Sequence, residues 1–136
     1  SKAAALCRET LAIDPADAHA DYTLAYVLEE EGDHDGAEAQ YLKAIEIDPR
    51  HVLSRSNLGN LLKDKGDLAG AEAAFLKAIE IDPHCVAAHS NLGSLLDDKG
   101  DLAGAEAAYL KAIEIDPHHV DAHFALGSLL GWKRGD

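Results

Sequence analysis

The sequence has few aromatic residues and no long apolar run. Aromatic side chains make up 5% of the 136 residues, whereas hydrophobic residues as a whole make up 47%. Because alanine and leucine account for much of this apolar share, the composition favours helices over strands. There is no run of about eighteen apolar residues that could cross a bilayer, and no basic-then-apolar leader opens the chain. We therefore expect neither a membrane protein nor a secreted one.

Cysteines and basic residues are also scarce. Cys7 and Cys85 lie far apart and lack the spacing of a metal site, so we expect no disulfide framework and a reducing, cytoplasmic setting. Acids outnumber bases by 25 to 12, which gives a formal net charge of -13. Such a surface repels nucleic acid and anionic lipid, and it favours a basic or neutral partner.

An Asp-Pro pair recurs every 34 residues along the chain. It stands at positions 14–15, 48–49, 82–83 and 116–117, and residues 52–85 are identical to residues 86–119 at 27 of 34 positions. This self-similarity indicates duplicated units, each too small to fold alone, that are stabilised by stacking on their neighbours.

Each period contains two apolar stripes at helical spacing. In the second period, Leu58 and Leu62 belong to the first stripe, Ala71 and Phe75 belong to the second, and a Gly-Asp pair separates them. The pattern predicts a helix, a tight turn, a second helix and a stop at the proline.

An aspartate in each turn is placed to cap the second helix. These aspartates are Asp33, Asp67 and Asp101. Three residues later, a glycine replaces the glutamate that would complete a capping box, so we expect a weak first turn in each second helix. These glycines are Gly36, Gly70 and Gly104.

The spacing of these residues resembles that of the tetratricopeptide repeat family. The residues that carry the resemblance are Leu58, Gly59, Leu62, Gly66, Asp67, Ala71, Phe75, Ala78 and Pro83. It implies an all-α fold, a right-handed α-solenoid of antiparallel helix pairs. We expect complete repeats over 18–51, 52–85 and 86–119, a second helix alone in 1–17 and a first helix alone in 120–136. The chain thus resembles an excised piece of a longer array, with Trp132 packing against structure beyond it.

The resemblance implies a protein-protein interaction scaffold, without enzyme activity, cofactor or metal. In this family the first helices line a concave groove that holds a peptide or a partner helix. The residues expected to line the groove are Tyr22, Tyr26, Ser56, Asn57, Asn60, Ser90, Asn91, Ser94 and Phe124. Two roles stay open for Asn57 and Asn91: binding the main chain of a partner, or joining adjacent helices.

Two further functions are compatible with the sequence. The repeats are similar to the arrays of O-linked N-acetylglucosamine transferases, so the chain could be the substrate-recognition segment of a larger enzyme. Alternatively, exposed terminal helices could stack end to end, which gives self-association.

Acidic residues gather late in the expected first helices. They are Glu29, Glu30, Asp64, Asp97 and Asp98. Lys63 is the lone base among them, so the basic clamp with which chaperone cofactors of this family hold acidic C-termini is not expected. An acidic rim favours a basic peptide, although a charge run of this kind is more often a solvated face.

The chain has eight histidines, which raises the question of a metal site. His119 and His123 share a helix face at a spacing that zinc sites use, but no cysteine or carboxylate completes the set. Asp21, Arg55, His89 and His123 are equivalent positions where a large apolar residue is common. For His89 and His123, lining the groove and packing between repeats both remain open.

Overall fold

The chain is helical throughout the residues that the structure describes. The computed structural model describes the backbone of residues 1–133 and the side chains of residues 1–131. The helices are α1 (Lys2–Ile13), α2 (Ala18–Glu30), α3 (His34–Ile47), α4 (Val52–Asp64), α5 (Leu68–Ile81), α6 (Val86–Asp98), α7 (Leu102–Ile115) and α8 (Val120–Lys133). The side chain of Trp132, expected to pack beyond the array, lies outside the described residues.

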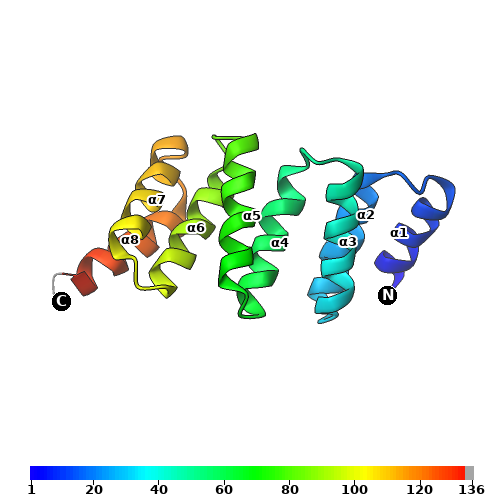
Figure 1. Cartoon of the computed structure of the whole chain (residues 1–136), viewed down its shortest axis with the longest axis horizontal. Helices are drawn as coiled ribbons and strands as arrows, with labels where there is room; N and C mark the ends of the chain where they lie inside the picture. The colour runs from blue at the N-terminus through cyan, green and yellow to red at the C-terminus, as the bar shows by residue number, and fades with distance from the viewer. Residues whose placement is uncertain (134–136) are drawn as a thin grey trace.

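The helices follow one another in a single row, with α1 and α8 at opposite ends (Figure 1). Within the row they contact in pairs, α2 with α3, α4 with α5 and α6 with α7, and each second helix then contacts the next first helix. The chain is therefore an all-α solenoid of antiparallel helix pairs. None of the helices described is both long and apolar enough to span a membrane.

Successive first helices lie closer together than successive second helices. The helix α4 contacts both α2 and α6, and α6 contacts α8, whereas no contact joins α3 to α5 or α5 to α7 in the described part of the chain. Because the row is tighter on the side of the first helices, this side is the inner side of its curve.

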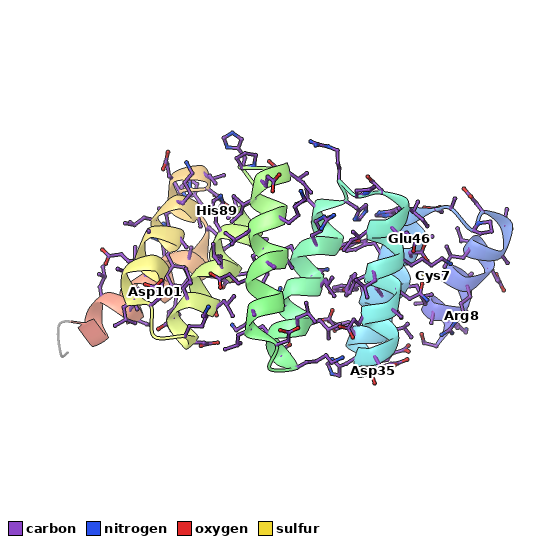
Figure 2. All side chains as sticks on the ribbon, viewed as in Figure 1. Cys7, Arg8, Asp35, Glu46, His89 and Asp101 are labelled. Carbon is purple, nitrogen blue, oxygen red and sulfur yellow. The ribbon has the colours of Figure 1, made fainter. Side chains whose placement is uncertain are left out.

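The turn within each pair is set by glycine and aspartate. Gly32, Gly66 and Gly100 have φ angles of 86°, 88° and 83°, a left-handed conformation that glycine adopts without steric cost. The aspartate that follows caps the second helix, and Asp101 is visible at the start of α7 in Figure 2. The Oδ1 atoms of Asp33, Asp67 and Asp101 each accept from a backbone N–H at 2.9 Å. The predicted caps are confirmed.

The glycines in the first turn of each second helix make room for these caps. A Cβ atom at Gly36 would lie 2.4 Å from Asp33 Oδ2, and one at Gly70 would lie 2.4 Å from Asp67 Oδ2. A larger residue would therefore displace the carboxylate that caps the helix. The expectation of a weak first turn considered only helix propensity and overlooked this role.

One aromatic ring fills the centre of each pair. Tyr41 and Phe75 are fully buried. A Cβ atom at Gly59 would lie 2.5 Å from the Phe75 ring, and one at Gly93 would lie 2.6 Å from the Tyr109 ring. The glycines thus allow the first helix to approach the ring. The core is a series of local clusters along the row and has no single centre.

Candidate binding surface

The inner side of the row presents three series of equivalent positions on α2, α4, α6 and α8. The first series consists of Tyr22, Ser56, Ser90 and Phe124. Their exposure differs widely: Ser56 is 1% exposed, whereas Phe124 is 76% exposed. Ser56 therefore lies between helices and has almost no surface for a partner, in contrast to its expected place in the groove lining. Tyr22 and Ser90 are half-buried.

The second series contains Asn57 and Asn91, and both join adjacent first helices. Asn57 Nδ2 donates to the Tyr22 hydroxyl at 3.5 Å, and Asn91 Nδ2 donates to Ser56 Oγ at 3.4 Å. These bonds are long, and both asparagines are only half-buried. An asparagine side chain has a second N–H and a carbonyl oxygen, so the same residues retain groups that a partner backbone could use.

The third series runs closest to the acidic residues. Tyr26 is 49% exposed, Asn60 and Ser94 are half-buried, and Ser128 is exposed. Ser94 Oγ accepts from Lys63 Nζ at 2.6 Å, a contact between α4 and α6. The side chains of this series are polar or aromatic, so they suit hydrogen bonding and stacking better than burial of a large apolar group.

The acidic residues divide into engaged and unengaged carboxylates. Glu29 Oε1 accepts from the Tyr41 hydroxyl at 2.9 Å, and burial together with this bond raises the pKa of Tyr41. Asp98 lies 3.3 Å from the Lys63 ammonium. Glu30, Asp64 and Asp97 are exposed. Part of the predicted rim thus holds the fold together, and part of it faces solvent.

Lys63 has a role that the sequence did not reveal. Its ammonium bridges α4 to Ser94 and Asp98 on α6. The sequence identified it only as the lone base of the rim. Its partners lie 31 and 35 residues along the chain, and they become visible only once α4 and α6 are known to be adjacent.

An aromatic cluster surrounds the start of α4. The Tyr22 ring lies 5.2 Å from the His51 ring, 5.7 Å from the His19 ring and 6.2 Å from the Tyr41 ring, measured between centroids. His51 is the N-cap of α4: its Nδ1 accepts from the Ser54 backbone N–H at 3.3 Å. Asp17 caps α2 at the equivalent position, and this equivalence was the sequence signal for the overlooked His51 cap.

The positions that lack a large apolar residue form a second repeated device. Arg55 Nε, His89 Nε2 and His123 Nε2 lie 2.9, 2.9 and 2.7 Å from the carbonyl oxygens of Pro49, Pro83 and Pro117. His89 is 8% exposed and lies on α6 beneath the preceding turn (Figure 2). His89 therefore packs between helix pairs and does not line the groove. Among the described residues, no group of three or more potential ligands could hold a metal ion.

Asp21 is the exception at these positions. Its side chain is fully buried, and neither carboxylate oxygen has a hydrogen-bond partner among the described residues. Lys43 Nζ lies 3.8 Å from Oδ1. Burial raises the pKa of Asp21, with an opposing contribution from Lys43. A carboxylate here cannot donate to a carbonyl as arginine or histidine can, so this position is destabilising when ionised.

Comparisons with known proteins agree with the helix pairs. A model of the tetratricopeptide repeat matches residues 56–120, and a second TPR repeat model matches residues 25–66. A comparison with curated proteins gives no match.

Solved structures with the same fold include repeat domains of several proteins. The crystal structure of MamA is 23% identical, with a TM-score of 0.82 over 93% of this chain and 74% of that chain. The first TPR of Spaghetti (RPAP3) bound to the HSP90 peptide SRMEEVD is 20% identical, with a TM-score of 0.81 over 86% and 93%. Pseudomonas aeruginosa pilF is 25% identical, with a TM-score of 0.87 over 95% and 59%. The two family models together span residues 25–120, and the chain belongs to the tetratricopeptide repeat family.

Proposed function

We propose that the chain binds an extended segment of another protein along the inner side of the row. The observation that carries this proposal is the series of half-buried amides and hydroxyls on successive first helices, above all Asn57 and Asn91. Their remaining N–H and carbonyl groups suit main-chain amides of any sequence. The structural neighbour that is bound to a peptide shows that a protein with this fold can hold one.

The charge of the inner side favours a basic segment. Glu30, Asp64 and Asp97 are exposed there, and the only lysine of this rim, Lys63, is already paired with Asp98. The peptide of the neighbouring structure, SRMEEVD, carries three acidic side chains. Because like charges repel across an interface, we expect this chain to bind basic peptides in preference to SRMEEVD. Both cysteines are free thiols, which suits a reducing, intracellular setting.

A selection from random dodecapeptides displayed on phage tests this proposal. Peptides recovered on the immobilised chain are synthesised, and their affinity is measured by fluorescence anisotropy. Replacing Asn57 and Asn91 together with alanine should weaken binding at least about tenfold, since two polar contacts are lost. The control replaces Leu76 and Leu110, which are 50% and 49% exposed on second helices, with alanine. Failure to recover any peptide, or equal affinity for both double variants, would refute groove binding.

Self-association is a second candidate, favoured by exposed apolar side chains on the two end helices. Leu6 and Ile13 on α1 are 62% and 87% exposed, and Val120 and Phe124 on α8 are 75% and 76% exposed. Light-scattering mass should then rise with concentration, and replacing Phe124 with serine, the residue at two equivalent positions, should abolish the rise. A constant monomer mass would leave peptide binding as the only candidate.

A further inference from the structure

A lysine of the chain itself lies between two first helices. Lys63 Nζ on α4 donates to Ser94 Oγ at 2.6 Å and lies 3.3 Å from Asp98 Oδ2, both on α6. The Lys63 side chain is only 22% exposed, so its ammonium is held against the inner surface. These contacts show which groups stabilise an ammonium ion between successive first helices: a neutral oxygen and a carboxylate.

The gap between α2 and α4 offers the same kinds of acceptor without the ammonium. The equivalent positions, 34 residues earlier, are Glu29, Asn60 and Asp64. An amide oxygen takes the place of the Ser94 hydroxyl and the carboxylate is kept, whereas lysine is replaced by a glutamate. In the described part of the chain, no cationic side chain forms an ion pair with these carboxylates.

The residues around this gap change together along the chain. Where lysine stands at position 63, the central ring of the pair is Phe75, which has no hydroxyl group. Where glutamate stands at position 29, the ring is Tyr41, whose hydroxyl donates to Glu29 Oε1 at 2.9 Å. The tyrosine therefore holds the Glu29 carboxylate in place, at a position from which a lysine would otherwise reach across the gap.

An exposed aromatic ring completes the surface. Tyr26 lies on α2, one turn before Glu30, and is 49% exposed. A tyrosine face accommodates the methylene chain of a lysine and attracts its ammonium group. No other series position on α4 or α6 carries an aromatic residue, so this surface is specific to the α2 end of the groove.

We propose that the gap between α2 and α4 binds the ammonium group of a lysine in the partner segment. The ammonium takes the place equivalent to that of Lys63 Nζ, near Asn60 Oδ1 and the carboxylates of Glu29 and Asp64, and the methylene chain lies on Tyr26. The proposal rests on groove binding as the proposed function, and it names the side chain that fixes the position of the partner. Acetylation of that lysine removes the charge and therefore the contact.

A graft of the internal lysine tests the geometry in the chain alone. In a Tyr41→Phe background, Glu29→Lys reproduces the residues of the next helix pair, and its ammonium should reach Asp64. Asp64→Asn should then lower the thermal midpoint more in the Glu29→Lys chain than in the Tyr41→Phe chain. Equal effects of Asp64→Asn in the two backgrounds would show that the gap does not hold an ammonium, and would overturn the proposal.

Binding of the recovered dodecapeptides tests the partner side chain. Norleucine in place of the contacting lysine should weaken binding about tenfold, the value of one charge-assisted contact. The Glu29→Lys, Tyr41→Phe chain should bind the lysine peptide no better than the norleucine one. The control is Glu46→Lys, an equal change of charge at an exposed residue of α3 (Figure 2).

The outcomes separate this inference from the proposed function. If Glu46→Lys weakens binding as much as Glu29→Lys, the effect is general electrostatics and the lysine site is wrong. If the lysine peptides bind and depend on Asn57 and Asn91 but not on Glu29, groove binding stands and only this inference fails. If no peptide binds at all, both fail.

Discussion

Protonation of His51 should weaken the start of α4. The His51 ring caps this helix: Nδ1 accepts from the Ser54 backbone N–H at 3.3 Å and lies 2.8 Å from Ser54 Oγ. Only a ring with an unprotonated Nδ1 can accept the backbone bond, and a positive charge at a helix N-terminus is unfavourable. Burial lowers the pKa of His51 below its usual value of 6.5, and the neighbouring His19 acts in the same direction.

The sign of the pH effect follows from this lowered pKa. The unfolded chain binds the proton more readily than the folded chain does, so the contribution of the cap is fully present above pH 6.5. It is lost as the pH falls through the folded pKa. Loss of a side-chain N-cap costs about 1 kcal/mol. For a chain of this length, about 1 kcal/mol lowers Tm by about 3–5 °C.

Thermal melts followed by far-UV circular dichroism at pH 7.5 and 5.5 measure the effect. His51→Asp provides a cap that stays ionised over this range, as Asp17 does at the start of α2. Relative to this variant, the Tm of the wild type should fall by about 3–5 °C between the two pH values. His84→Asp makes the same charge change in an exposed turn, and its difference from the wild type should vary less with pH. A pH-independent difference between wild type and His51→Asp would refute the cap mechanism.

Three further changes test the packing. Gly70→Ala should give little of the gain of about 1 kcal/mol expected from helix propensity, because its Cβ displaces the Asp67 carboxylate; in an Asp67→Ala chain the full gain should appear in urea unfolding, and equal gains would contradict the shared-space argument. Asp21→Asn should stabilise the chain by about 1–3 kcal/mol at pH 7. Since burial raises the pKa of Asp21 above 3.8, the penalty on the wild type develops as the pH rises, and the stability difference should shrink towards pH 4. Gly93→Ala should cost about 1–3 kcal/mol in the same assay, because its Cβ would lie 2.6 Å from an aromatic ring. At Gly127, which has nothing within 4 Å of a Cβ, alanine should be neutral or stabilising.

The helix pairs and their caps could be predicted because their signals are local. A leucine stripe, a glycine, an aspartate and a proline each act within a few residues, and the period of 34 repeats them. The capping roles of Asp33, Asp67 and Asp101 followed from their position alone. His51 was overlooked because histidine is an unusual cap, although Asp17 stands at the equivalent position.

Contacts between helices could not be predicted from the period alone. Ser56 and Phe124 are equivalent in sequence, yet one is 1% and the other 76% exposed, because exposure depends on what the neighbouring helices contribute. The partner of Asn57 is a tyrosine hydroxyl and that of Asn91 a serine hydroxyl, each on the preceding first helix. Such pairings depend on the stagger between helices, which the sequence pattern does not contain.

The restriction of contacts to neighbours along the row has a genetic consequence. Each helix of the described chain touches only helices one or two steps away, so no contact would be broken at a distance if a whole unit of 34 residues were inserted or removed. Unequal crossing-over between the nearly identical segments 52–85 and 86–119 would produce such a change in one step. The number of units is therefore a property that recombination can alter without redesigning the core, and the length of the segment that the groove can accept would change with it.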